Sequence, residues 1–150
     1  MYQSTKTYGH EIGLSCAFRQ HRAPSHCHFV HGYALAFKFV FESTELDYRN
    51  WVVDFGGLKP LKNLLEKYFD HKVILAEDDP ELEYFKEGER VGVLELTILP
   101  HVGCEAFAQK GYEFAKEVIS NMGLTHNVRV LSCEVSEHGA NSAVYLDNNN

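Results

Sequence analysis

An alternating run of aromatic residues constrains the fold of this chain more than any other feature. Successive side chains of a β-strand point to opposite faces. In an extended segment 33–41, every residue on one side is therefore large and apolar: Tyr33, Leu35, Phe37, Phe39 and Phe41. The other side carries Ala34, Ala36, Lys38 and Val40, followed by Glu42. The pattern predicts a strand with one face in a hydrophobic core.

Weaker patterns on both sides predict the remaining elements, in the order strand, strand, helix, helix, strand, strand. They cover a strand within Thr5–Arg19 interrupted by two glycines, helices that begin near Gly56 and Cys104, and closing strands at about Val128–Glu137 and Ser142–Leu146. The acidic segment 78–92 is expected to be a loop with at most one short helix. Segment 93–99 fits either a strand or the buried end of that excursion. This order predicts an α+β fold, with a four-stranded antiparallel sheet and two helices on one face.

Such a sheet leaves its second face and both outer edges uncovered. The unpaired N–H and C=O groups of an edge strand can pair with another chain. Exposing the aromatic side chains of a strand to water is also unfavourable. Pairing of edges between copies, so that the sheets close into a β-barrel, would cover both surfaces. We therefore expect a homo-oligomer.

Length and composition indicate a single domain spanning residues 1–150. Hydrophobic residues make up 45% of the chain and charged residues 23%, which is typical of a folded globular protein. The apolar runs are far shorter than the ~20 residues of a membrane helix, and no signal segment opens the chain, so we expect no membrane association and a cytoplasmic protein. A net charge of −7 argues against a nucleic-acid partner. The four cysteines form no C-x-x-C pair, so we expect reduced thiols.

Three places in the chain combine residues that carry chemistry. Cys27 lies among four histidines between positions 21 and 31, and an imidazole can accept a thiol proton; the alternative is an ordinary buried cysteine. Asp70 precedes His71 and can orient its imidazole; the alternative is a helix end whose charges favour the dipole. Glu137 follows a strand, where a carboxylate can bind the N–H pair of a pterin or guanine; the alternative is a solvated acid beside a turn.

Five motifs in order along nearly the whole chain are more specific together than any one of them. They are Cys27-x-x-x-His31-Gly32, Val53-Asp54-Phe55-Gly56-Gly57-Leu58-Lys59, Phe69-Asp70-His71-Lys72, Cys104-Glu105-Ala106-Phe107-Ala108 and Val135-Ser136-Glu137-His138. With them the chain resembles the tunnelling-fold family of 6-pyruvoyltetrahydropterin synthase and 6-carboxytetrahydropterin synthase. The family's own motifs are C-x-x-x-H-G-H, M-D-F-x-x-L-K, L-D-H-K, P-T-x-E-N-L-A and V-x-E-T.

The resemblance implies a ββααββ unit that oligomerises into a barrel, with a hexamer and active sites at subunit interfaces. It implies a lyase acting on 7,8-dihydroneopterin triphosphate or a related pterin, and the 6-carboxytetrahydropterin synthases serve 7-deazaguanine (queuosine) biosynthesis. By this resemblance Cys27 is the general acid or base, and Asp70 with His71 is its relay partner. Glu137 anchors the pterin, and Glu105 corresponds to the glutamate of the helix-start motif, beside Gly103 where the family has threonine.

The resemblance also implies zinc, held in the family by three histidines from the F-x-A-x-H-R and H-G-H patterns. Only His31 matches, because Phe18 and Tyr33 stand at the other two positions. A catalytic zinc site needs about three such ligands. Replacements would have to come from Cys16 or from the loop histidines, and none of these has the required spacing.

Two functions therefore stay open. One is a lyase of this family. The other is a paralogue that binds a pterin or purine without the zinc-dependent reaction, as a binding protein or a metal-free enzyme. The presence of Cys27, Asp70 and His71 beside Glu137 favours an enzyme, because a binding protein needs only Glu137. The loss of two zinc ligands favours altered chemistry.

Overall fold

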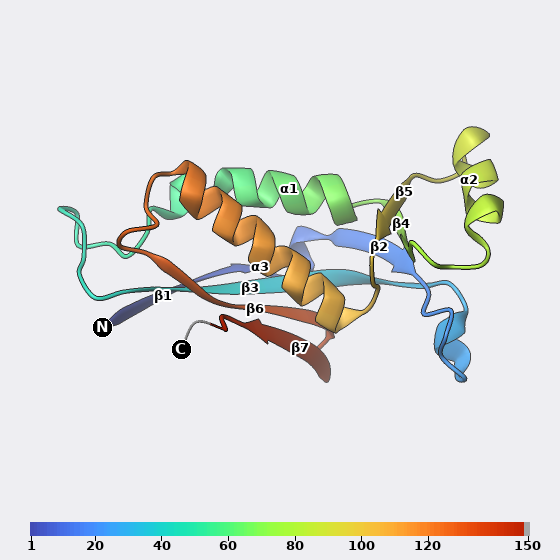
Figure 1. Cartoon of the computed structure of the whole chain (residues 1–150), viewed down its shortest axis with the longest axis horizontal. Coiled ribbons are helices and arrows are strands. Elements are labelled where there is room, and N and C mark those ends of the chain that lie inside the picture. Colours follow the sequence, from blue (N-terminus) through green and yellow to red (C-terminus); the bar gives the residue numbers. More distant parts are fainter. Residues whose placement is uncertain (149–150) are drawn as a thin grey trace.

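One long strand forms the centre of the sheet in the computed structural model, which describes residues 1–148 (Figure 1). Strand β3 (His31–Ser43) pairs antiparallel with β1 (Tyr2–Tyr8) and β2 (Leu14–Phe18), and also with β6 (Arg129–His138). Beyond β6 lies β7 (Asn141–Leu146), joined by a hairpin. The predicted strand and the closing hairpin are confirmed.

Two helices cover one face of this sheet, as predicted (Figure 1). Helix α1 (Lys59–Phe69) follows a short 3-10 turn, and α3 (Cys104–Asn121) packs against both α1 and β6. The aromatic side of β3 faces the helices, and Phe37, Phe39 and Phe41 are completely buried. The alternation in this strand thus supplies the centre of the hydrophobic core.

Within residues 1–148 the sheet contains seven strands, so the predicted number of four was too low. Strand β4 (Lys72–Ala76) lies parallel to β2, and β5 (Leu96–Leu99) lies parallel to β4. The sequence of β4 is a short apolar run without alternation, which is typical of parallel strands and is hard to distinguish from a helix end. Within segment 93–99, residues Leu96–Leu99 form strand β5, so the strand alternative holds for the second half of the segment.

Two further segments refine the prediction. The segment predicted as one interrupted strand is two strands, β1 and β2, separated by a 3-10 turn and by Gly13, whose φ of 77° is left-handed. The acidic excursion contains α2 (Leu82–Arg90), which protrudes from one end of the molecule (Figure 1). This matches the single short helix allowed there.

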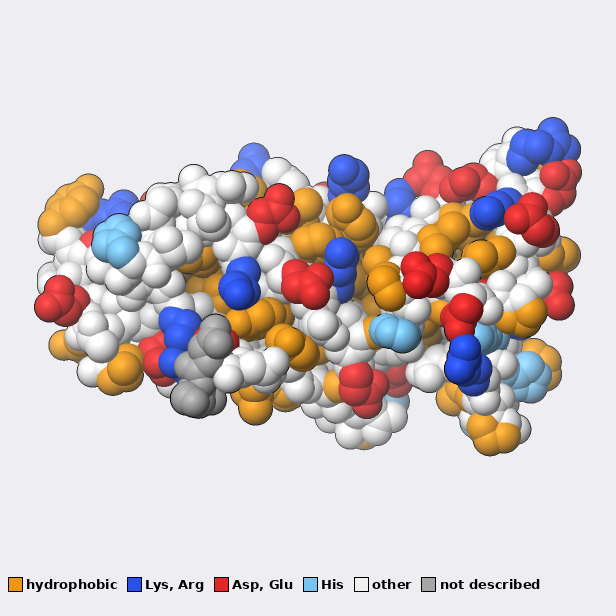
Figure 2. All heavy atoms as spheres, in the orientation of Figure 1, with side chains coloured by type: hydrophobic (Ala, Val, Ile, Leu, Met, Phe, Trp, Pro, Cys, Tyr) orange, Lys and Arg blue, Asp and Glu red, His pale blue; other side chains and the backbone are white. Residues whose placement is uncertain are grey.

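The charged side chains on the surface are consistent with the net charge of −7. On the face shown in Figure 2, basic and acidic side chains are intermingled rather than gathered into a basic patch. Within residues 1–148, no helix is both long and apolar enough to cross a membrane. Histidine side chains gather toward the end that carries the β2–β3 loop (Figure 2).

Candidate functional site

An aromatic cluster occupies the end of the sheet where β2 meets β3. Phe18 and His31 are direct partners across the two antiparallel strands, and their ring centroids lie 4.8 Å apart. The Tyr33 ring lies 6.0 Å from Phe18 and 5.7 Å from His31, and Phe107 of α3 closes the cluster at 5.1 Å from Phe18. The three positions that the resemblance assigns to zinc ligands therefore do converge.

Tyr33 connects this cluster to the predicted acid and thiol. Partial burial raises the pKa of Tyr33, and the nearby groups of Glu137, Cys27 and Cys104 raise it further. The phenol is consequently neutral at physiological pH and able to donate a hydrogen bond. The His138 ring lies 6.0 Å from Tyr33 on its other flank. Residues distant in the sequence thus meet around one phenol.

Glu137 lies at a register shift in strand β6. The pairing of β6 with β7 shifts register between Ser136 and His138, so Glu137 itself has no direct partner on β7. Bulges of this kind redirect side chains. The half-buried carboxylate lies close to the thiol of Cys104 at the start of α3, and its charge helps to raise the pKa of that thiol. This arrangement differs from a solvated acid beside a turn.

Cys104 is a site residue that sequence reasoning missed. Its burial raises the pKa of the thiol to about 12, and the charge of Glu137 acts in the same direction. The thiol therefore stays protonated. Its membership of the helix-start motif was the only sequence signal for it.

Cys27 lies in the connection between β2 and β3, in a 3-10 turn of residues 26–28. The Ser25 hydroxyl accepts a hydrogen bond from the Cys27 backbone N–H at 3.3 Å, and the Cys27 carbonyl accepts one from Gln20 at 3.0 Å. The thiol is partly exposed, whereas the other three cysteines are buried, and all four are free. Neighbouring His28 bonds to the Ser25 carbonyl.

Asp70 and His71 do form a pair, which sequence adjacency alone did not require. His71 Nδ1 lies 2.8 Å from Asp70 Oδ1, and the imidazole is 83% exposed. His71 takes a left-handed φ of 60°, and its backbone N–H donates to the Ser15 carbonyl at 2.6 Å. This turn after α1 presents the imidazole to solvent.

The pair and Cys27 lie at different ends of β2. His71 bonds to Ser15 near the start of the strand, and Cys27 bonds to Gln20 just beyond its end. At the ordinary rise of a strand these two points are roughly 15 Å apart. Among residues 1–148, no hydrogen bond or ion pair joins Asp70 or His71 to Cys27.

Glu105 is exposed in the first turn of α3, where a carboxylate stabilises the helix dipole. The residue before the helix, Gly103, has a φ of 126°. A Cβ at this position would lie 3.1 Å from the amide nitrogen of Gln20. The structure thus brings neither residue into contact with the aromatic cluster, and Gln20 takes the room that a threonine side chain would need.

The donors present do not fit the family's zinc. Phe18 offers no lone pair, Tyr33 is neutral, and His31 alone has an imidazole, with Nδ1 held 2.8 Å from the Phe29 carbonyl. Within residues 1–148, no three His, Cys, Asp or Glu side chains are grouped so that they could hold a metal ion. Cys16 and the loop histidines therefore do not complete a ligand set with His31.

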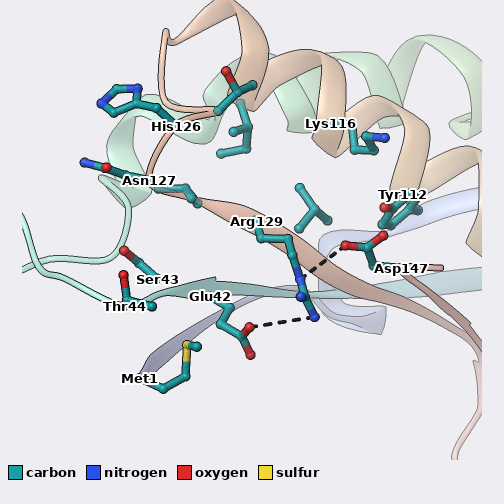
Figure 3. Close-up of a pocket in the computed structure, with 14 residues that line it drawn as sticks. Met1, Glu42, Ser43, Thr44, Tyr112, Lys116, His126, Asn127, Arg129 and Asp147 are labelled. Carbon is teal, nitrogen blue, oxygen red and sulfur yellow. Dashed lines mark ion pairs between the residues drawn. The ribbon is translucent and has the colours of Figure 1, made fainter. Parts of the chain in front are cut away.

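A separate cavity of about 480 Å³ lies at the opposite end of β3 (Figure 3). Arg129 projects between Glu42 and Asp147, with ion-pair distances of 3.7 and 3.2 Å. Lys116 and Tyr112 of α3 form its upper wall. None of the predicted site residues lines this cavity.

Comparison with known proteins agrees with this fold and this arrangement of motifs. The 6-carboxy-5,6,7,8-tetrahydropterin synthase of Aquifex aeolicus is 28% identical over 140 residues, which cover 90% of this chain and 85% of that protein. An uncharacterized protein from Wolinella succinogenes superposes with a TM-score of 0.79 at 21% identity, over 98% of both chains. A catalytic-residue mutant of the Plasmodium vivax 6-pyruvoyltetrahydropterin synthase superposes with a TM-score of 0.69 at 18% identity, over 99% of both chains.

These structural likenesses confirm the predicted tunnelling fold. The sequence model of one family, described as 6-pyruvoyl tetrahydropterin synthase, matches residues 9–148. Because this match covers nearly the whole chain, the protein belongs to the 6-pyruvoyl tetrahydropterin synthase family.

Proposed function

We propose that the protein is a lyase that acts on 7,8-dihydroneopterin triphosphate or a closely related pterin, in the manner of 6-carboxytetrahydropterin synthase. The observation that supports this proposal is the aromatic cluster of Phe18, His31 and Tyr33, with His138 beside it, to which the groups of Glu137 and Cys27 lie close enough to raise the pKa of Tyr33. An acid for the ring, a thiol for proton transfer and a phenol donor in one place constitute a site for a polar heterocycle.

Each residue then has a chemical task. The Glu137 carboxylate accepts the N–H pair of the pterin ring through charge-assisted hydrogen bonds. The Cys27 thiol gives or takes a proton at the substrate side chain. The imidazole of His71, oriented by Asp70, exchanges protons with solvent.

The separation of this pair from Cys27 supports a site that is shared between copies. The 83% exposure of the His71 imidazole leaves it available to a neighbouring chain. We propose that the Asp70–His71 pair of one copy meets Cys27 of the next within a homo-oligomer, for which edge pairing into a barrel is the expected arrangement.

No step of the proposed reaction passes through zinc, because the residues at the family's ligand positions do not fit it. This mismatch is also the observation that favours a second candidate function. A paralogue that binds a pterin or purine without the lyase reaction would use Glu137 and would not need the exposed His71.

A complementation assay tests the lyase and its shared site together. We expect the wild-type protein to convert dihydroneopterin triphosphate, with the product identified by absorbance and mass. Cys27→Ala and His71→Ala should each lose ~100-fold or more of this activity. Co-expression of the two variants should restore about one site in four, because each site draws one residue from each chain.

The outcomes separate the alternatives. If the co-expressed variants assemble but lyase activity does not return, the shared site is contradicted. A wild-type protein that binds the pterin and leaves it unchanged would favour the binding paralogue. Activity that survives Cys27→Ala would contradict the role of the thiol.

The role of Glu137 is tested by removing only its charge. Glu137→Gln should weaken the binding of a pterin by ~1.5–3 kcal/mol, because charge-assisted hydrogen bonds become neutral ones, while the unfolding transition stays in place. Glu134→Gln is the matched control, since it lies on the same strand and bonds to Ser142. Equal affinities of wild type and Glu137→Gln would rule out the anchor.

The metal prediction concerns the protein as isolated. We expect no stoichiometric zinc at Phe18, His31 and Tyr33, as measured by elemental analysis of protein purified without an affinity tag. The double change Phe18→His with Tyr33→His should recruit zinc, because the strand pairing already brings the three positions together. About one zinc per chain in the unmodified protein, lost on His31→Ala, would show that replacement ligands exist.

A further inference from the structure

The loop that carries Cys27 is attached to a distant part of the chain by one buried ion pair. Arg19, the last residue before this loop, donates from Nε to Asp79 Oδ2 at 2.8 Å and from Nη2 to Asp79 Oδ1 at 3.0 Å. Two parallel N–H···O bonds from one guanidinium fix its orientation as well as its position. Asp79 follows β4, 60 residues away in the sequence.

The same guanidinium extends the attachment to the backbone beside Cys27. Arg19 Nη1 donates to the carbonyl of His28, the next residue after Cys27, at 3.5 Å. The Cys27 carbonyl is held at 3.0 Å by the backbone N–H of Gln20, the residue next to Arg19. The peptide groups before and after His28 are thus tied to Arg19 or its neighbour.

Asp79 is built to hold this arginine. It is only 4% exposed, and its Oδ1 also accepts the backbone N–H of Glu81 at 2.9 Å. Burial acts to raise the pKa of Asp79, but the hydrogen bonds from Arg19 and the backbone outweigh it and hold that pKa below its ordinary value. A buried carboxylate with its lone pairs satisfied is a rigid anchor, and removing its charge leaves the guanidinium without its partner.

The neighbouring aspartate makes a weaker contact with the same loop. Asp78 pairs with Arg22 and His21. Its own side chain is 46% exposed and that of Arg22 is 81% exposed, whereas the His21 side chain is 8% exposed. Exposed pairs of this kind contribute little to holding a segment in place. Asp79 therefore binds the loop through a buried ion pair with Arg19, and Asp78 binds it through an exposed ion pair with Arg22.

We propose that Asp79 is a positioning residue, which acts through Arg19 to hold the Cys27 segment in the geometry that proton transfer requires. This inference rests on the proposed function for the catalytic part, and on the ion pair alone for the placement of the thiol. Strand β4 connects the turn of Asp70 and His71 to Asp79, so one strand orders both halves of the proposed site.

The placement of the thiol is measured without substrate. Cys27 is the partly exposed cysteine and the other three are buried, so iodoacetamide applied to the folded protein reports on Cys27, with the modified residue identified by mass. We expect Asp79→Asn to change the alkylation rate by ~3-fold or more, because the freed segment samples other conformations. Asp78→Asn, the matched control, should stay within ~2-fold of wild type.

The catalytic consequence is measured on the same variants. With the pterin substrate, Asp79→Asn should lower kcat by ~10- to 100-fold and change KM far less, because the ring-binding Glu137 is untouched. Arg19→Lys keeps a charge beside Asp79 and loses the fork, so it should fold and show an intermediate decrease. If Asp79→Asn fails to fold, the positioning role is tested by the alkylation rate and kcat of Arg19→Lys.

Alkylation and kcat that match wild type in both Asp79→Asn and Arg19→Lys would overturn the positioning role. So would equal effects of Asp78→Asn and Asp79→Asn, which would indicate general loosening. A protein whose Cys27→Ala variant stays fully active would refute the proposed function instead, and the alkylation result would still decide the placement of the loop.

Discussion

The pairing of β2 with the first residues of β3 determines where the chemistry of this protein lies. Phe18 faces His31 and Cys16 faces Tyr33 across the two strands. A slip of β2 by one residue would turn its side chains to the other face of the sheet. The buried residues of β2 prevent such a slip, since Leu14, Cys16 and Phe18 would then leave the core. The packing that stabilises the fold therefore also sets the register of the site.

This constraint explains how the family's geometry persists while its donors are replaced. The three positions that the resemblance assigns to zinc meet within 4.8 to 6.0 Å of one another, measured between ring centroids. Two of them now carry rings without an available donor for zinc. Around Tyr33 the thiols and the Glu137 carboxylate remain. At these positions the chain thus has an aromatic cluster, and the residues that we propose for acid–base chemistry are present in the sequence.

Sequence reasoning succeeded where periodicity carries the information. The alternation in β3 predicted that strand, because a period of two residues is satisfied by an extended chain and not by a helix. Strand β4 was not predicted, because its apolar run has no period. Without β4, nothing in the sequence indicated that His71 and Cys27 bond to residues near opposite ends of β2. The aim of Glu137 depends on a register irregularity in β6, and the pair of Arg19 with Asp79 spans 60 residues. Neither leaves a local signal in the chain.

We propose that this family member converts a pterin through its own side chains, at a site where Phe18 and Tyr33 replace two of the family's three zinc ligands. The decisive measurement is the turnover number before and after exhaustive dialysis against a strong chelator. We expect the same rate of pterin conversion in both samples, and no gain when zinc is added back. Conversion that disappears with the chelator and returns with zinc would contradict this proposal, and so would a wild-type protein that converts no pterin in either sample.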